Sequence, residues 1–455
     1  MTDQFSSWGE KALSGVERLR QSNHDLRGRM GALLFLLRGA YYTEQSKYRR
    51  YAEEDLRALW RGGVHDHIGG GFFSYSGDAE WLRPSFEKRL DDNARLALLY
   101  TEAWESGHMT FYRDAAESTL DWILAELAAP SGLYMAGQFS EKGFTADNPY
   151  LWTPEKLAGQ LGQESGRHFA ECYDISDEPN CGEASIPNLI LNDRWHLAGE
   201  KYDDDRERLR LARQGFAGIE TDGRTPADWN ALLLAALARA ARAFTDERYL
   251  AAAHALARPL DGIDQESLAP QALAAFLFAK TELYCADFDP AHLLSAIALG
   301  ERLESVLDAA SMTPGEECDR AWALAAQGFD ALWCLTADRK WIEARGKCLR
   351  ELCLHADRHG PDSLDGLCAL LSASHTARAI LCVSPDEAVP PALAPFRARY
   401  APDLKILLKT PENAAALALA APWSEPFTCG TEPRFYPALD GKWGRAAPGS
   451  ETAAN

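Results

Sequence analysis

The sequence predicts an all-α protein whose helical hairpins close into a toroid of two concentric rings, followed by a small α/β unit. Three observations predict this fold class. A helical hairpin recurs along the chain, the first helix of each pair is apolar nearly all round, and the second helix is amphipathic. We assign residues 1–375 to the toroid, 376–430 to the α/β unit, and 431–455, which are rich in Gly, Pro and Ala, to an irregular tail.

The hairpin repeat is easiest to see in two copies that open with Asn-Ala, at residues 93–127 and 230–260. Residues 30–60 and 321–353 follow the same pattern, and residues 271–304 form a looser copy. A single hairpin cannot bury its apolar face, so neighbouring hairpins must stack. The apolar first helices then form an inner ring and the amphipathic second helices an outer ring. Uneven repeat lengths favour a closed toroid over a regular open solenoid.

The C-terminal part changes its period. Residues 379–383 and 404–408 are short apolar runs that predict buried strands, and residues 390–400 and 411–420 predict intervening helices. This order is typical of a small βαβ-like unit.

The connections between hairpins are long, and they predict where a ligand binds. Residues 61–84, 130–153 and 170–226 lead into the N-termini of inner helices, whereas the turns inside the hairpins are short. Helix N-termini present unpaired N–H groups and the positive end of the helix dipole, which suit polar or anionic ligands. We therefore expect the pocket at this end of the toroid.

The composition excludes several classes of protein. The net charge of −20 argues against nucleic acid and anionic membrane as partners. The chain has no apolar run near the roughly 20 residues of a membrane span and no secretory leader at its start, so we expect a cytoplasmic location and reduced cysteines. Among the ten cysteines there is no CxxC pair. We interpret the cluster of Cys348, Cys353, His355 and His359 as buried thiols with a helix-end histidine, and expect no metal site.

Residues 65–95, HDHIGGGFFSYSGDAEWLRPSFEKRLDDNAR, gather the most reactive chemistry. Three consecutive glycines, several aromatic rings and a run of charged residues suit a pocket for a polar ligand. Carboxylates and a histidine of near-neutral pKa suit proton transfer, so the predicted catalytic residues are Asp66, His67, Glu87 and Asp92. The predicted substrate-binding residues are His65, Tyr75, Trp81, Arg83, Lys88, Asn93, Trp152, Trp229 and Asn230.

The spacing within this segment predicts a helix that starts near residue 85 and an extended stretch at residues 65–67. Pro84-Ser85 predicts a helix start with Ser85 as N-cap, which places Glu87 and Asp91 on one face and Lys88 and Asp92 on the next. The alternative to a catalytic role for these residues is a helix N-terminus whose acidic side chains are favoured by the helix dipole and form solvated ion pairs.

Histidines 65 and 67 are predicted on the same side of an extended segment, with Asp66 opposite, and hydrogen bonding to the backbone is the alternative. Asn230 is explained by N-capping of an inner helix. The tryptophans either stack on a ligand or pack between the rim loops.

At this point the motifs resemble a known family. Residues 65–100 resemble the signature of the spermatogenesis-associated thioredoxin-like family, and LWTPE at 151–155, DWNAL at 228–232 and FTC at 427–429 follow in family order. The resemblance covers roughly residues 25–430 and implies a six-hairpin (α/α) toroid similar to N-acylglucosamine 2-epimerases. We expect the toroid part alone, without the thioredoxin-like domain that precedes it in the family, and a separate thioredoxin-like chain as a candidate partner.

The chain departs from the family pattern at three positions near the expected pocket. Ser85 replaces the family's histidine, and Arg89 and Asp91 replace its methionine and tyrosine. These changes indicate a divergent substrate or a loss of activity.

The residues and the resemblance together predict an acid/base enzyme that acts on a carbohydrate or a similar polyhydroxylated small molecule, as an epimerase, isomerase or hydrolase. Two alternatives stay open: a non-catalytic binding or scaffold protein, and a modifying enzyme for a peptide or lipid. No cofactor is expected, because the sequence has neither a P-loop nor a GxGxxG motif after a strand.

Overall fold

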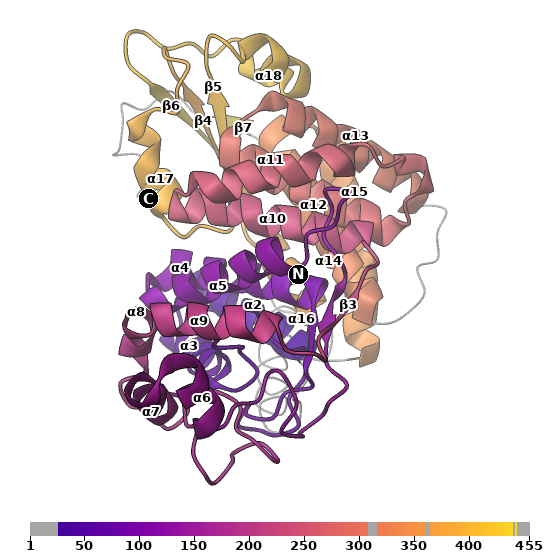
Figure 1. Ribbon diagram of the computed structural model, residues 1–455. Helices are drawn as coiled ribbons and strands as arrows, with labels where there is room; N and C mark the ends of the chain where they lie inside the picture. The colour runs from indigo at the N-terminus through magenta and orange to yellow at the C-terminus, as the bar shows by residue number, and fades with distance from the viewer. Residues whose placement is uncertain (1–25, 308–315, 360–363, 440–441, 444–455) are drawn as a thin grey trace.

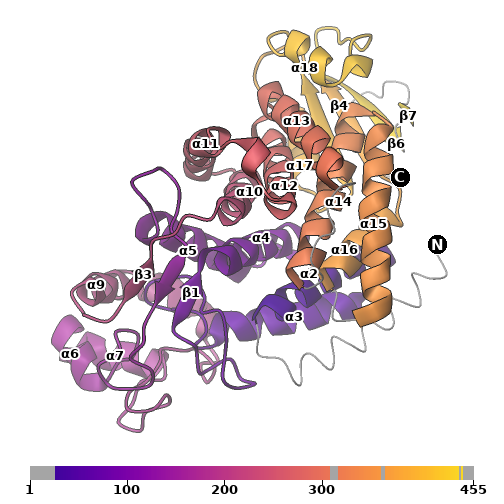
Figure 2. The same ribbon diagram turned by 90° about the vertical axis from the view of Figure 1, so that its right-hand side faces the viewer.

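The computed structural model describes residues 26–307, 316–359, 364–439 and 442–443. Within this part of the chain, six helices contact one another in a closed cycle and form the inner ring (Figure 2). In order around the ring they are α2 (Leu26–Thr43), α4 (Leu90–Gly107), α10 (Ala227–Phe244), α12 (Pro270–Asp287), α14 (Glu316–Thr336) and α16 (Leu364–Ala373). The α16 helix contacts α2, which closes the ring and confirms the predicted toroid.

The outer ring consists of helices that follow inner helices directly along the chain. They are α3 (Ser46–Arg61), α5 (Thr110–Glu126), α11 (Glu247–Asp261), α13 (Pro290–Leu307) and α15 (Lys340–His359). The predicted difference between the rings is confirmed, since every residue of α12 from Ala272 to Ala286 is buried whereas α3 buries one face. Burial on all sides is the reason that the inner helices are mainly apolar.

The rim at the inner-helix N-termini carries more structure than the predicted loops. It contains α6 (Pro154–Leu161), α7 (Gln163–Cys172), η1 (Trp195–Leu197), α8 (Ala198–Lys201), α9 (Asp203–Gln214) and η2 (Gln265–Ser267). An antiparallel sheet joins three of the connections, in the order β1 (Glu87–Arg89), β2 (Gly137–Phe139) and β3 (Glu220–Asp222). The long connection predicted at residues 170–226 therefore contains η1, α8, α9 and β3.

The helix predicted to start at Ser85 begins instead at Leu90, with Arg89 as its N-cap residue. Residues 87–89 pair with β2, and the buried Phe86 just before them has a positive φ of 55°. Pairing between strands thus outweighs the local helix signal. On a strand, successive side chains alternate, so Glu87 is exposed and Lys88 is buried, and the predicted sharing of helix faces does not occur.

Two asparagines fasten inner helices to the loops that precede them. Asn93 is the fourth residue of α4, and its amide accepts from the N–H of Phe72 at 2.7 Å and donates to the C=O of the same residue at 3.0 Å. Asn230, the fourth residue of α10, clamps Tyr134 with the same two bonds, at 2.7 and 3.0 Å. The shared Asn-Ala pattern therefore marks a repeated clamp.

The predicted role of Asn230 as an N-cap was wrong, because Pro226 occupies that position of α10. The Asn230 amide also donates to the C=O of Pro226 at 2.9 Å, and the Asn93 amide donates likewise to Arg89 at 2.8 Å. All polar atoms of both amides are thus used by the backbone.

The three glycines allow their loop to lie directly against its neighbours. A Cβ atom on Gly69 would lie 1.7 Å from Arg213 Nη2, and one on Gly70 would lie 2.4 Å from the C=O of Ser118 in α5. Gly70 and Gly71 have positive φ values of 78° and 75°. Close approach and left-handed backbone both require glycine here.

The C-terminal unit is a four-stranded sheet of order β5-β4-β6-β7, at the opposite end of the molecule from α6, α7 and α9 (Figures 1 and 2). Its strands are β4 (Arg378–Val383), β5 (Leu404–Lys409), β6 (Arg434–Leu439) and β7 (Lys442–Trp443). Its helices are η4 (Pro391–Leu393), α17 (Ala394–Ala398), α18 (Ala414–Ala420) and η5 (Pro422–Ser424). The parallel pair β4–β5 confirms the predicted βαβ-like unit.

The irregular tail predicted from residue 431 was wrong for β6 and β7. Strand β6 runs antiparallel to β4 and buries Phe435, Tyr436 and Ala438, so these apolar residues complete the sheet. Among the described helices, none combines the length and apolar composition that crossing a membrane would require.

We predict that Asn93→Ala lowers the free energy of unfolding by about 2–4 kcal/mol, because it leaves the N–H and C=O of Phe72 buried without partners. Urea denaturation of the purified chain measures this loss. The matched control is Gln163→Ala on an exposed position of α7. Equal stability of Asn93→Ala and the control would contradict the clamp.

Candidate functional site

The axis of the toroid contains a cavity that inner-helix side chains line at helical spacing. Helix α4 contributes Arg95, Leu98, Leu99 and Glu102, α2 and α14 contribute similar rows, and α10, α12 and α16 contribute one or two residues each. The space, together with its opening to solvent, is about 650 Å³. Its walls are mainly apolar, and its charged groups gather at the two ends.

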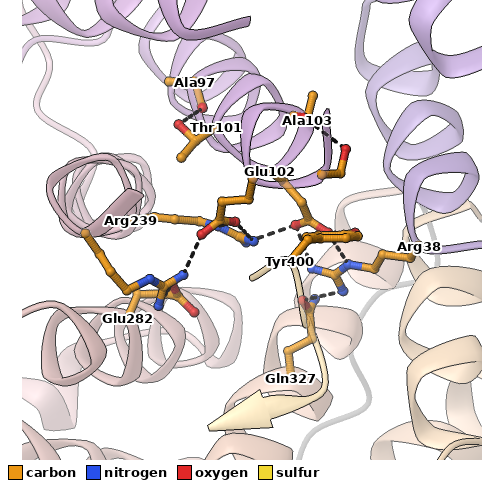
Figure 3. Close-up of polar contacts among 12 residues, drawn as sticks. Arg38, Ala97, Thr101, Glu102, Ala103, Arg239, Glu282, Gln327 and Tyr400 are labelled. Atoms are coloured by element: carbon orange, nitrogen blue, oxygen red, sulfur yellow. Dashed lines mark hydrogen bonds and ion pairs between the residues drawn. The ribbon is translucent and has the colours of Figure 1, made fainter. Parts of the chain in front are cut away.

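Glu102 holds one end, the floor of the cavity (Figure 3). Arg38 binds its carboxylate through two nitrogens at 2.9 and 3.2 Å, Arg239 binds it at 2.9 Å, and the Tyr400 hydroxyl donates to it at 2.8 Å. Burial alone would raise the pKa of Glu102, but the two guanidinium charges and the hydrogen bonds lower it to about 2. Glu102 is therefore an ionised, fully paired group.

The ionic network continues from the floor toward the C-terminal sheet. Arg239 also binds Glu105 at 2.6 Å, and Arg242 reaches Glu282 at 3.7 Å. Lys405 of β5 lies 3.6 Å from Glu282. Beyond this network lies a second cavity, of about 1100 Å³, between the toroid and the C-terminal unit. The network thus separates two spaces.

The other end of the central cavity lies at the N-termini of the inner helices, which ion pairs join to one another. Asp92 of α4 binds Arg27 of α2 at 3.0 Å, and Arg95 of α4 binds Asp365 of α16 at 2.9 Å. We call this end the toroid mouth. It comprises Arg27, Arg89, Asp91, Asp92, Arg95, Asp228, Trp229, Arg320 and Asp365.

Asp91 lies among several charged groups of the mouth. Arg89 binds it at 3.0 Å, and Arg320 of α14 lies 3.9 Å away. The Arg89 guanidinium also lies over the ring of Trp229, 4.4 Å from its centroid. Trp229 is therefore part of the mouth, covered by a cation from β1.

Two other carboxyl groups of the mouth hold protons more tightly than usual. Burial raises the pKa of Asp92, and the negative charge of Asp91 raises it further, against the opposing effect of Arg27. Burial also raises the pKa of Asp228, with Asp91 again contributing. Asp228 is only half-buried, so it combines a raised pKa with access from solvent. Such groups are suited to general acid/base catalysis.

The predicted catalytic residue Asp66 lies elsewhere, in a buried ion triad. Lys88 donates to it at 2.7 Å and Arg213 at 2.9 Å, and the N–H of Gly69 donates at 3.0 Å. Burial would raise the pKa of Asp66, but Arg213 and Lys88 hold it well below its usual range. Burial lowers the pKa of Lys88 to about 8. The triad anchors the glycine loop to β1 and α9.

His65 and His67 lie together, as predicted, with their Nδ1 atoms 3.3 Å apart. Burial lowers the pKa of His67 to about 4 and that of His65 as well, so both rings are neutral. His67 Nε2 donates to the C=O of Gly62 at 3.1 Å, which leaves its Nδ1 as an acceptor for the Nδ1–H of His65. This order leaves Nε2 of His65 unprotonated. Both residues line an open groove beside α5 and α9.

The remaining predicted residues are scattered. Tyr75 is 48% exposed, and Arg83 and Glu87 are also exposed. Trp152 is fully buried in a cluster around α6 and α7, and Trp81 is buried beneath Arg29. The structure therefore brings together His65, Asp66, His67 and Lys88 in one place and Asp92 and Trp229 in another. Among the described cavities, Glu87 shares none with Trp152 and none with Trp229.

Four residues of the mouth were not predicted from the sequence: Arg95, Asp228, Arg320 and Asp365. All four lie in the first two turns of inner helices, where their ring neighbours lie far away in the sequence. A search for charged residues at the start of each predicted inner helix would have found them, and Asp228 directly precedes Trp229, which the analysis did select.

Known proteins resemble this chain both in sequence and in fold. The chain is 27% identical to spermatogenesis-associated protein 20 of Mus musculus over 242 residues, which is 46% of this chain and 31% of the mouse protein. The human protein is 26% identical over 227 residues, 42% of this chain and 29% of its own length. Over this stretch the chain is similar to spermatogenesis-associated protein 20. The predicted resemblance is confirmed there, although the chain spans only about a third of these curated relatives. No family model matches the sequence.

Among solved structures, cellobiose 2-epimerase of Spirochaeta thermophila is 15% identical, with a TM-score of 0.49 over 76% of this chain and 84% of the epimerase. An α-1,6-mannanase variant of Salegentibacter is 12% identical, with a TM-score of 0.40 over 77% of each chain. These likenesses concern the helical fold and not the reaction.

We predict that Asp66→Asn destabilises the protein by about 3–5 kcal/mol, because it leaves two buried cations without their counter-charge. Thermal or urea denaturation measures the loss. Asp204→Asn, on an exposed position of α9, is the control and should change stability by less than about 0.5 kcal/mol. A loss for Asp66→Asn no larger than that of the control would contradict the anchoring role.

We also predict that the Glu102 network makes stability depend on acid. The folded-state pKa of about 2 lies below the ordinary value of 4.5, so the unfolded chain binds more protons between these values. The stabilisation is complete above about pH 5 and is lost toward pH 2, by about 3 kcal/mol in all. Glu102→Gln should remove this part of the pH dependence of urea denaturation.

If Glu102→Gln does not fold, Tyr400→Phe removes one hydrogen bond to the same carboxylate and should shift the acid midpoint slightly upward. An unchanged pH profile in the folded variants would show that the network does not carry this dependence.

Proposed function

We propose that this chain is an enzyme that binds a polyhydroxylated small molecule, such as a carbohydrate, at the toroid mouth and in the central cavity, and moves protons with the mouth carboxyl groups. One observation carries the proposal. Asp92 and Asp228 both have a raised pKa and share Asp91 as a charged neighbour, and Asp91 lies 3.9 Å from Arg320, which lines the cavity. Carboxyl groups in different environments take the acid and base roles of one reaction.

The cavity is better suited to a neutral polyhydroxylated ligand than to an ion. Arginine donors and carboxylate acceptors occur together at both of its ends, with Arg95 beside Asp365 at the mouth and Arg38 beside Glu102 at the floor. A hydroxyl group both donates and accepts hydrogen bonds, so it pairs with either partner. The apolar wall between the ends suits the C–H faces of such a molecule.

The roles that we propose for the mouth carboxyl groups follow from their exposure to solvent and from the charged groups beside them. Asp228, half-buried with a raised pKa, is the proton donor or acceptor that a ligand reaches first. Asp91, beside Arg89 and Arg320, is the neighbouring carboxylate. Epimerisation, isomerisation and hydrolysis all need such a pair. The small-molecule substrate and the separate thioredoxin-like partner remain predictions. The catalytic roles predicted for Asp66, His67 and Glu87 also remain predictions.

A binding protein without catalysis is the second candidate. It is favoured by the arrangement of residues 65–71, whose Asp66 and glycines serve to fix a loop against α5 and α9.

We predict that the wild-type chain exchanges a carbon-bound proton of at least one sugar in a panel of mono- and disaccharides with solvent deuterium. Asp228→Asn should slow this exchange by about 100-fold or more, and Asp92→Asn should also slow it, because each removes a proton-transfer group. Proton NMR in deuterated buffer measures the exchange. The exposed Asp204→Asn variant is the control and should keep the wild-type rate.

Thermal shift with each sugar separates binding from catalysis. Sugar-dependent melting without exchange or turnover would favour the binding protein, and neither effect with any sugar would contradict the proposal. Loss of exchange in Glu87→Gln together with full activity in Asp92→Asn and Asp228→Asn would move the reaction to the exposed face of β1.

A further inference from the structure

Two histidines and an aspartate meet at the end of the toroid remote from the mouth. His254 lies on α11, Asp287 is the last residue of α12, and His292 lies in the first turn of α13. Their ligand atoms all lie within 4.8 Å of one another. The mouth is formed at the N-termini of the inner helices, and α12 spans about 27 Å at 1.5 Å per residue. This cluster is therefore separate from the proposed reaction site.

Both imidazoles contact the same carboxylate oxygen. His254 Nε2 lies 2.8 Å from Asp287 Oδ2, and His292 Nε2 lies 3.2 Å from it. An ion bound at about 2.1 Å by tetrahedral ligands keeps those ligands about 3.4 Å apart. The two carboxylate–imidazole distances lie within about 0.6 Å of this spacing, and all three ligand atoms lie within 4.8 Å of one another.

The backbone holds the carboxylate in this orientation. Asp287 Oδ1 accepts the N–H of Asp289 at 2.9 Å, so Oδ2 is the oxygen that faces the histidines. The turn itself is fixed, because Phe288 has a φ of 61° and its N–H donates to the C=O of Tyr284 at 2.7 Å. Orientation of a ligating carboxylate by a second hydrogen bond is a regular feature of metal sites.

We propose that His254, Asp287 and His292 bind a divalent transition-metal ion of the zinc type. Two imidazole nitrogens and one carboxylate oxygen form a ligand set that zinc accepts. The side chains are 40%, 11% and 17% exposed in that order, which leaves room for water as the fourth ligand. The bound ion links α11, α12 and α13 and stabilises two neighbouring hairpins against each other. The sequence analysis predicted no metal site, since these residues are spread over 39 positions.

The test uses the full chain after treatment with a chelator. Titration with zinc chloride, followed by calorimetry, should show one equivalent in the wild type that is absent from His254→Gln and from Asp287→Asn. Asp287→Asn keeps an oxygen for the N–H of Asp289, so it removes the charge with little change to the turn. The control, His196→Gln at an exposed position, should bind as the wild type does. Zinc should raise the melting temperature of the wild type and the control only.

Cobalt substitution distinguishes this site from the cysteines of the chain. The one equivalent of cobalt that the wild type binds and the variants do not should give visible ligand-field bands in the wild type. It should not give the near-ultraviolet charge-transfer bands that thiolate ligands produce. If the variants do not fold, protection of His254 and His292 from diethylpyrocarbonate by zinc in the wild type is the readout. Equal zinc binding in wild type and folded variants, thiolate bands on the lost equivalent, or no protection of the two histidines would overturn the proposal.

Discussion

The ion pairs around Glu102 set the geometry on which the rest of the toroid depends. One carboxylate joins α4 to α2 through Arg38 and to α10 through Arg239, and Tyr400 attaches the C-terminal unit to the same point. These four segments lie far apart in the sequence, so the network fixes how the ring closes. Charges buried in this way stabilise a fold only when every member is paired, and here the carboxylate is fully paired.

The network also decides the shape of the interior. It blocks the axis of the ring, so the central cavity ends in paired charges instead of opening to the C-terminal unit. The mouth is then the end that carries carboxyl groups with raised pKa values. The same helices therefore carry tightly paired ions at one end and carboxyl groups that hold protons more tightly at the other, and the apolar wall separates the two environments.

Apolar periodicity was sufficient to predict the hairpins, the two rings and the strands β4 and β5, because helix and strand burial leave a direct pattern in the sequence. The start of α4 was predicted wrongly, since β1 pairs with a strand about 50 residues away and this contact overrides the local signal. Asp66 and Lys88 were selected for their chemistry, yet Arg213, which joins them in one triad, lies 147 residues from Asp66. Arg95, Asp228, Arg320 and Asp365 of the mouth were missed for the same reason, because these charges converge only through ring closure.

The small sheet β1-β2-β3 has a consequence for how the rim behaves. It joins three separate connections by backbone hydrogen bonds, and β1 continues directly into α4 through Arg89. A change of length or position in any one connection is transmitted through this ladder to the other two and to the first turn of that helix. The three connections are therefore mechanically coupled to one another at this sheet.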